Sequence, residues 1–316
     1  MRALIGMING NFRCLFLKGG GWMEIAFTKM HGIGNSYIYI DLFQHHYEEE
    51  IFSSLAKQIS NTNTGIGSDG LIVIHPSENA DCGMRIINKD GSEGTNCGNG
   101  LRCVAKYVFE RNIILKEKFI IETKSGMMHV HVIVKNNVVI ETVIDMGVPL
   151  LHRQHVPMIG NPEDLVIHEL FNLPCHNLFV TALFLGNPNA VFFVENIEDA
   201  PLHSLGGVIE NDNRFPKRVN VEFVEVIHST ELNFRVWERG SGITEACGTG
   251  ACAAVVAAIL NGFCQKGEDI VVHLSGGDLL IRWDIDDHVW MRGPAAFIAD
   301  GIYYFSKTKG CENWKD

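Results

Sequence analysis

The chain has 316 residues, of which 46% are hydrophobic and 20% are charged, and its formal net charge is −11 at pH 7. This length allows one large domain or two domains with separate cores, and we expect two. The composition is typical of a compact globular protein without low-complexity tracts. An acidic balance with no cluster of Lys and Arg argues against nucleic acid as a partner.

The N-terminal segment does not predict a signal peptide, because glycine and asparagine residues interrupt its apolar runs and no small-residue cleavage pattern follows. We treat residues 1–22 as an N-terminal extension without an assigned role, since Met23 directly precedes the first clearly patterned strand. The longest apolar helical stretch, 251–260, is far shorter than the ~20 residues of a membrane span, so no membrane contact is expected. Nine cysteines without an export signal indicate reduced thiols and a cytoplasmic protein.

The first half of the chain predicts a mostly hairpin-connected sheet with two helices. One helix is expected near 48–59 and the other directly after Cys97. Asn136-Asn137 is typical of a tight turn between the last two strands. The expected strands are 25–29, 37–41, 71–75, 84–88, 119–123, 128–134 and 138–145.

The second half repeats this order of elements. Its helices are expected near 202–209 and directly after Cys247. The segment 251–260 is apolar on every face of a helix and must therefore be enclosed, so we expect a sheet curled around a central helix. Mostly antiparallel strands with few helices predict an α+β fold. The expected strands are 178–185, 190–194, 219–227, 233–237, 270–274, 279–283, 289–292 and 297–305.

A shift of 150 residues superimposes the two halves on each other. Cys97-Gly-Asn-Gly then faces Cys247-Gly-Thr-Gly, and Arg85 faces Arg235. We interpret the match as an internal duplication that gives two pseudo-symmetric domains with the active-site cleft between them. The domains are expected at 23–145 and 146–295, with the last strand, 296–305, joining the first domain.

The two Cys-Gly-x-Gly turns indicate the chemistry. Unpaired N–H groups at a helix start stabilise a thiolate and can bind a substrate carboxylate. Two thiols facing one molecule can invert a stereocentre, because one thiolate removes a proton and the other thiol returns one to the opposite face. Most single cysteines are buried and inert, and we expect this of the other seven. A disulfide between Cys97 and Cys247 is an alternative that a reducing compartment disfavours.

Other motifs are weaker. Residues 65–70 fit the Gly-x-Gly-x-x-Gly pattern, but a strand follows where a dinucleotide site needs a helix. The cysteine and histidine residues lack the spacing of metal ligands, so no metal is expected.

Further motifs accompany the two cysteine turns. Together they are Lys29-Met-His-Gly-Ile-Gly-Asn35, Arg85-Ile-Ile-Asn88, Cys97-Gly-Asn-Gly, Gly186-Asn187-Pro188, Arg218-Val-Asn220-Val and the run from Glu238-Arg239 to Cys247-Gly-Thr-Gly. With these motifs the chain resembles the diaminopimelate epimerase family from Met23 to about Phe305. The resemblance implies that two cysteines interconvert the LL and meso forms of 2,6-diaminopimelate, a precursor of lysine and peptidoglycan, without pyridoxal phosphate or metal. It also implies paired similar domains and a homodimer.

The resemblance also implies roles for individual residues. Cys97 and Cys247 correspond to the acid/base thiols. The backbone of the two helix starts would receive the reacting carboxylate, at Gly98, Asn99, Gly248 and Thr249. The two amines and the distal carboxylate would be bound by Asn35, Asn88, Asn187, Asn220, Glu238 and Arg239. An arginine suits the distal carboxylate because it can donate two parallel hydrogen bonds. Without the family context, a Glu-Arg pair is more typical of a solvated surface and each Asn of a turn.

Two positions depart from the family pattern. Gly70 stands where many members have Gln, and Asn189 stands where many have His, which affects the expected rate or pH profile more than the reaction type. Two alternatives stay open. One is a proline racemase or hydroxyproline epimerase, although those enzymes resemble Cys-Gly-His-Gly at the first motif. The other is a non-catalytic amino-acid-binding relative.

Overall fold

The structure is a computed structural model that describes residues 22–94, 98–174 and 176–306. Cys97 and residues 1–21 of the expected N-terminal extension lie outside the described residues. The first half contains β1 (Trp22–Gly32), β2 (Asn35–Asp41), α1 (Phe52–Ile59), β3 (Gly70–His75), β4 (Cys82–Asn88), β5 (Glu93–Gly94), α2 (Gly98–Glu110), β6 (Lys118–Thr123), β7 (Gly126–Lys135) and β8 (Val138–Asp145). A single 3-10 turn, Glu49–Ile51, precedes α1.

The second half repeats the succession of strands and helices. It contains β9 (Val166–Leu173), β10 (His176–Leu185), β11 (Asn187–Val194), α3 (Leu202–Glu210), β12 (Asn220–His228), β13 (Glu231–Glu238), β14 (Gly242–Ile243), α4 (Gly248–Leu260), β15 (Ile270–Leu274), β16 (Gly277–Trp283), β17 (Val289–Gly293) and β18 (Ala296–Ser306). Every strand and helix expected from the sequence is present. Three strands were not expected, namely β5, β9 and β14.

The pairing of strands follows the same scheme in both halves and confirms the α+β, pseudo-symmetric fold. β2–β3 and β4–β6 are parallel pairs, and so are their equivalents β11–β12 and β13–β15. The other pairings are antiparallel, and together the strands form one curled 18-stranded sheet. α2 and α4 each have 13 residues and begin 150 positions apart, at Gly98 and Gly248.

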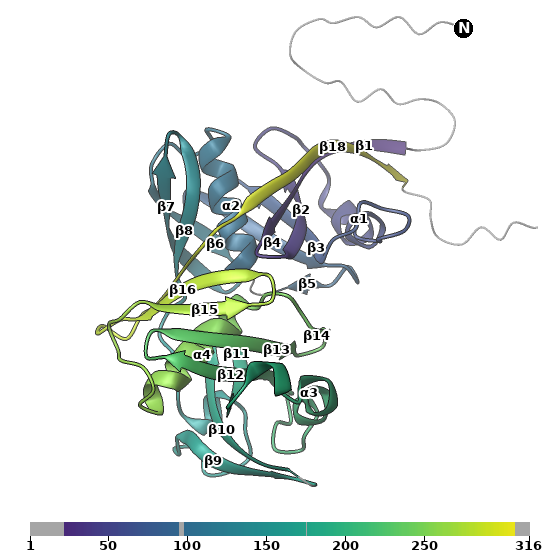
Figure 1. The fold of residues 1–316 in the computed structure, drawn as a ribbon. Coiled ribbons are helices and arrows are strands. Elements are labelled where there is room, and N and C mark those ends of the chain that lie inside the picture. The colour runs from purple at the N-terminus through teal and green to yellow at the C-terminus, as the bar shows by residue number, and fades with distance from the viewer. Residues whose placement is uncertain (1–21, 95–97, 175, 307–316) are drawn as a thin grey trace, which may run out of the picture.

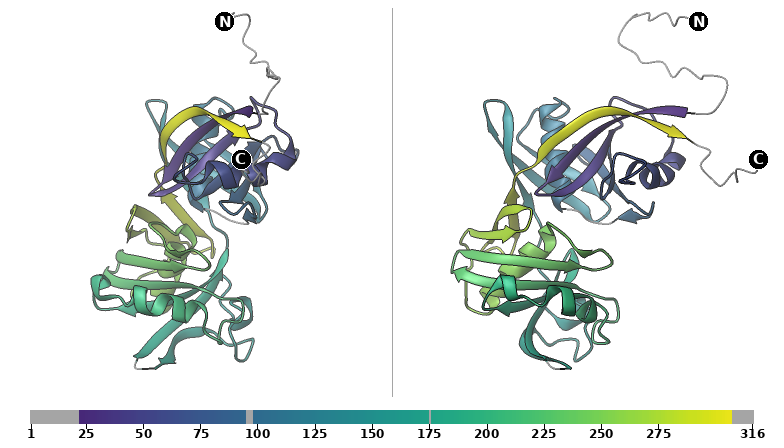
Figure 2. Two further views of the ribbon diagram at one scale, coloured as in Figure 1. Left: turned by 90° about the vertical axis from the view of Figure 1, so that its right-hand side faces the viewer. Right: turned by 45° about the vertical axis from the view of Figure 1, so that its right-hand side comes forward.

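The first half is completed by a strand from the end of the chain, whereas the strand at the equivalent place in the second half comes from that half itself. β18 leaves the second half and pairs along β1, from Trp22 beside Ser306 to His31 beside Ala296. β9 makes the equivalent antiparallel pair with β10, and β8 pairs with β17 where the halves meet. Figure 1 shows β18 in yellow running up into the N-terminal half beside β1, and both views in Figure 2 agree. The domain boundaries at residues 145 and 295 stay predictions.

The two long helices lie inside the curled sheets. α4 is buried from Gly248 to Ala258 and packs against strands β10 to β13 and β15 to β17, as its uniform apolarity requires. α2 is also buried although it carries Arg102 and Lys106. The Lys106 ammonium group donates hydrogen bonds to Glu110 and to the carbonyl oxygen of Val139, which satisfies the charge inside the core. Across the described ranges, no helix combines the length and apolarity needed to cross a membrane.

Candidate active site

The starts of α2 and α4 meet at the contact between the two halves. A Cβ atom on Gly98 would lie 2.9 Å from Cε of Met291, and one on Gly248 would lie 2.9 Å from Sδ of the same side chain. Met291 belongs to β17, the strand that joins the halves through β8. The two helix N-termini therefore converge on one side chain, and the N–H groups of their first turns can serve one anion.

Asn99 connects the two helix starts by its side chain. Its Nδ2 donates to the carbonyl oxygen of Ala246, just before α4, at 2.9 Å and to Oδ1 of Asn35 at 3.3 Å. Its Oδ1 accepts a 2.9 Å hydrogen bond from Arg102, whose Nε donates to the carbonyl oxygen of Pro294. Asn99 was expected to act through its backbone; the structure gives its side chain a bridging role as well.

Cys247 is the N-cap residue of α4 and is 4% exposed. Its Sγ accepts a 3.4 Å hydrogen bond from the N–H of Gly250 and lies 3.4 Å from the hydroxyl of Thr249. The helix start was expected to favour the thiolate. That expectation is wrong here, because burial and the nearby carboxylates raise the pKa of Cys247 well above its ordinary value. The hydrogen bonds with Gly250 and Thr249 lower the pKa, but by less.

Glu238 at the end of β13 is the carboxyl group whose charge acts most strongly on this thiol. Its Oε1 accepts a 2.5 Å hydrogen bond from Thr244, and its carboxyl group lies within hydrogen-bonding reach of Cys247. Burial raises the pKa of Glu238 above its usual range, and Asp69 in the other half adds to the shift. The influence of Asp69 on Glu238 means that polar groups of both halves face each other here.

The predicted distal group of Asn187, Asn220 and Arg239 is assembled at neighbouring strand ends. The backbone N–H of Arg239 donates to Oδ1 of Asn220 at 2.9 Å, and its guanidinium donates to Oδ1 of Asn187 at 3.4 Å. Asn189, the position where many family members have His, is fully buried. Its amide group donates to the carbonyl oxygen of Asn187 and accepts from Asn220, so it braces two predicted binding residues.

Asn35 and Asn88 supply the corresponding edge of the first half. Asn35 Nδ2 donates to Asp69 at 2.8 Å, and Asn88 Nδ2 donates to Ser92 at 3.0 Å. Gly70 pairs with Asn88 between β3 and β4. A Cβ atom on Gly70 would lie 2.5 Å from the carbonyl oxygen of Ile87 and 3.0 Å from the Tyr37 ring, so this backbone position has no room for a side chain.

Sequence reasoning missed several residues that shape the site. Thr244 and Asp69 hold Glu238 and Asn35, and no local pattern distinguishes them from ordinary turn residues. Glu222 lies fully buried on β12 beneath the site, and a charged residue between Val221 and the apolar pair Phe223-Val224 was a signal that could have found it. Within the described part of the chain, no group of three or more potential ligands could hold a metal ion.

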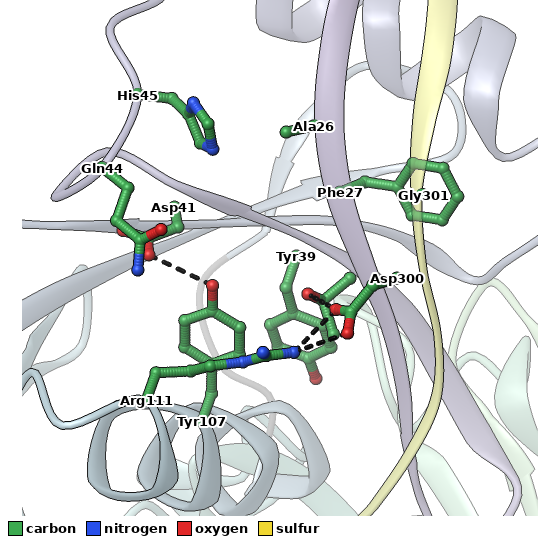
Figure 3. Close-up of a pocket in the computed structure, with 11 residues that line it drawn as sticks. Ala26, Phe27, Tyr39, Asp41, Gln44, His45, Tyr107, Arg111, Asp300 and Gly301 are labelled. Carbon is green, nitrogen blue, oxygen red and sulfur yellow. Dashed lines mark hydrogen bonds and ion pairs between the residues drawn. The ribbon is translucent and has the colours of Figure 1, made fainter. Parts of the chain in front are cut away.

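A separate cavity of about 170 Å³ lies at the opposite end of α2, between β1, β2 and β18. Figure 3 shows its polar wall, where Arg111 is paired with Asp300, and Tyr107 donates a hydrogen bond to Asp41. None of the residues predicted for the site lines it. Its volume is below the ~300–1,000 Å³ typical of small-molecule sites.

The fold belongs to a class of two-domain proteins that includes amino-acid racemases and epimerases. A hydroxyproline epimerase from Agrobacterium vitis superimposes with a TM-score of 0.66 over 91% of this chain and 93% of that one, at 12% sequence identity. A phenazine biosynthesis protein of the PhzF family from Bacillus anthracis superimposes with a TM-score of 0.64 over 89% of this chain and 99% of that one, at 16% identity. At these identities the likeness shows the fold alone.

Sequence comparison identifies the family. The model named Diaminopimelate epimerase matches residues 27–151 and 181–298, and the chain belongs to this family. A diaminopimelate epimerase from Oceanobacillus iheyensis is 58% identical over 90% of this chain and all of that protein. Another from a Geobacillus species is 53% identical over 89% of this chain and 99% of that protein. The family resemblance expected from the motifs is thereby confirmed.

Proposed function

We propose that this protein interconverts LL- and meso-2,6-diaminopimelate by moving a proton between two cysteine thiols. The observation that carries the proposal is the convergence of two equivalent helix starts, 150 residues apart, on Met291, with Cys247 capping one of them. Relatives that are 52–58% identical over nearly their whole length carry the name of this enzyme. The alternative of a proline racemase-like enzyme rests on structures that are at most 16% identical.

The proposed reaction transfers one proton in each of two steps. In one direction, the Cys97 thiolate takes the proton from the α-carbon, and the electron pair of the C–H bond spreads onto the adjacent carboxylate. Cys247, as a thiol, then gives its proton to the opposite face of the carbon and becomes a thiolate. In the reverse direction the two thiols exchange roles, and no redox step is needed.

The helix starts are suited to the charge that develops during this reaction. The N–H groups at Gly98, Asn99, Gly248 and Thr249 point out of helix N-termini, where a carboxylate gains negative charge as the carbanion forms. The raised pKa of Cys247 makes it a strong base once it is ionised and keeps it a thiol at neutral pH, which is the form needed to donate a proton.

The distal group of residues fits the far end of this substrate. Diaminopimelate carries a second ammonium and a second carboxylate group at the end away from the reacting carbon. Arg239 can bind that carboxylate with two hydrogen bonds, and the amide oxygens of Asn35, Asn88, Asn187 and Asn220 can accept from the amine. Proline has no such groups, so the distal residues distinguish the two substrates.

Deuterium exchange tests the proposal directly. Reduced protein in heavy water should incorporate deuterium at the α-carbon of LL-diaminopimelate while the meso form appears. Mass spectrometry and NMR report both events. Absence of exchange would favour a non-catalytic binding protein, and exchange into proline with none into diaminopimelate would favour the proline racemase alternative.

The proposed enzyme works in the cytoplasm as a homodimer, as the family resemblance implies. Sedimentation analysis of the full chain should give twice the 35.2 kDa mass of one chain. A species of 35.2 kDa that retains activity would contradict the dimer.

A further inference from the structure

Glu222 is a carboxyl group enclosed in the core beneath the site. It lies on β12 and is 0% exposed. Across the described part of the chain, neither of its oxygens has a hydrogen-bond partner, although the N–H groups of Ala190 and of Glu222 itself lie near enough to lower its pKa slightly. An unpaired carboxyl group in a protein core is unfavourable for folding, so its presence requires a reason.

The duplicated half shows that the fold does not need a carboxyl group at this position. The equivalent residue in the first half is Ile72, which is also fully buried. Ile72 pairs with Tyr39 and Ile86, and Glu222 pairs with Val191 and Val236 at the equivalent strand positions. An aliphatic side chain therefore fills the equivalent buried position in the sheet. A carboxyl group at position 222 must be explained by the groups that it faces.

Glu222 faces the first turn of α4. A Cβ atom on Gly250 would lie 3.1 Å from Oε1 of Glu222 and 3.2 Å from Sγ of Cys247, so the carboxyl and the thiol approach one point from two sides. Glu238 on β13 is the other titratable group that acts on Glu222. The paired residues of β11 on this side are apolar, and Asp69 reaches the cluster only through Glu238.

The environment keeps Glu222 neutral. Burial raises its pKa well above the ordinary value, and the charge of Glu238 adds to the shift. A charge on Glu222 would in turn raise the pKa of Cys247. Loss of a proton from either group therefore makes loss of a proton from the other less favourable, and the two titrations are coupled.

We propose that Glu222 is a positioning residue that holds a proton beside Cys247 and so controls how readily this thiol ionises. While Glu222 is protonated, the thiolate has one carboxylate near it, that of Glu238. When Glu222 loses its proton, the thiolate has two carboxylates near it. The proposal rests on the acid/base role proposed above for Cys247, but Glu222 itself does not reach the substrate.

Two substitutions imitate the neutral form permanently. Glu222→Gln preserves the shape of the side chain, and Glu222→Ile copies the residue at the equivalent position of the first half. Glu225→Gln is the matched control, because Glu225 lies on the same strand but bonds to Asn233 and Ile197 on the other side of the sheet. The Ile variant should also raise the melting temperature by roughly 2–4 °C, because it removes a buried unpaired polar group.

The decisive measurement is the pH dependence of iodoacetamide alkylation at Cys247. The folded protein is alkylated at each pH, the reaction is stopped, and the modified fraction is quantified on the Cys247 peptide by mass spectrometry after digestion. The midpoint should fall by roughly one pH unit in Glu222→Gln and Glu222→Ile. It should not move in Glu225→Gln. Epimerisation in the direction that uses the Cys247 thiol as the proton donor should also fall off at lower pH in the two Glu222 variants than in the unmodified protein, because the thiol ionises earlier.

The outcomes separate this inference from the proposed function. Alkylation midpoints of Glu222→Gln and Glu222→Ile that coincide with the unmodified protein would overturn the role of Glu222, whatever happens to activity. A loss of activity in proportion to lost stability, without a shift in midpoint, would show a purely structural residue. If the alkylation midpoint shifts but the unmodified protein exchanges no deuterium into diaminopimelate, the coupling between Glu222 and Cys247 is retained and the proposed function is overturned instead.

Discussion

Cys247 lies where two opposite physical effects act on one thiol. The N–H of Gly250 and the positive end of α4 favour the thiolate, whereas burial and the Glu238 carboxyl group favour the thiol. Burial dominates in the structure. Ionisation of this group thus depends on the surrounding carboxyl groups and on a bound substrate more than on the helix start alone.

Substitution of Cys247 by Ser tests its role while leaving a small polar N-cap. A hydroxyl is a far weaker acid than a thiol, so the interconversion of LL- and meso-diaminopimelate should slow by roughly 10²–10⁴-fold. Coupled kinetics and deuterium incorporation measure the loss. Cys252→Ala, in the next turn of the same buried helix, should keep activity within a few-fold. Full activity in Cys247→Ser would contradict a two-thiol mechanism.

Gly70 illustrates how a departure from the family pattern is built into the backbone. A Gln side chain there must displace the carbonyl oxygen of Ile87 or the Tyr37 ring, so Gly70→Gln should lower the free energy of unfolding by about 1–3 kcal/mol. Urea denaturation checks this, with exposed Lys89→Gln as the control. Improved substrate affinity without loss of stability in Gly70→Gln would show that the backbone adapts more freely than we expect.

At the scale of elements, the strands of the second half are joined by polar side chains as well as by the ladder. His273 on β15 bonds to Asp278 across the β15–β16 hairpin at 2.8 Å and to Glu231 on the adjacent β13 at 2.9 Å. These two carboxylates raise the pKa of His273 above its ordinary value. The protonated imidazole on β15 thereby links this strand to both of its neighbours, β13 and β16.

The stability of this strand group should depend on pH. Because the folded-state pKa is raised, the contribution is fully present below the unfolded value of about 6.5 and is lost as the pH rises through the folded value. His273→Gln should therefore cost more at pH 6 than at pH 9, by about 0.5–1 kcal/mol for these partly exposed groups. Urea denaturation at both pH values measures the difference, and an equal cost at both would refute the coupling.

Prediction from the sequence succeeded for elements with regular patterns and failed where the pattern is interrupted. The fully apolar run of α4 and the alternation of β7 were sufficient to identify them. β9 was missed because its register with β10 shifts near His168, whose φ is +50°, and the bulge breaks the alternation of buried and exposed residues. β5 and β14 have two residues each, too few for any period to appear.

For the site, the motifs identified which residues take part but not how they are held. The family motifs include Asn99 and Glu238, whereas the hydrogen bond from Asn99 to Ala246 joins residues 147 positions apart. The pKa of Cys247 depends on burial by segments from several strands, which no local pattern encodes. Glu222 is the exception, since a charged residue among Val221, Phe223 and Val224 was visible in the sequence.

At the scale of the whole molecule, β18 completes the sheet of the first half although it is the last strand of the chain. A chain truncated after Ala295 should leave the whole edge of β1 unpaired and should aggregate on expression. A rearranged chain, in which residues 296–306 come first and a short glycine-rich linker leads from Ser306 to Trp22, should recover soluble protein. Trp22 lies opposite Ser306 in the register, so the linker can be short. Soluble, monodisperse truncated protein would contradict this view.

The pairing of β1 with β18 also has a consequence for how the protein forms in the cell. A ribosome makes β1 first and β18 almost last, so the amino-terminal half emerges long before its closing strand exists. Folding units usually form as they leave the ribosome, in order from the amino terminus. Here the carboxy-terminal half can close earlier, because β9 is already available when β10 appears. The half synthesised second is thus free to mature first, and the nascent edge of β1 must be kept from other chains until translation ends.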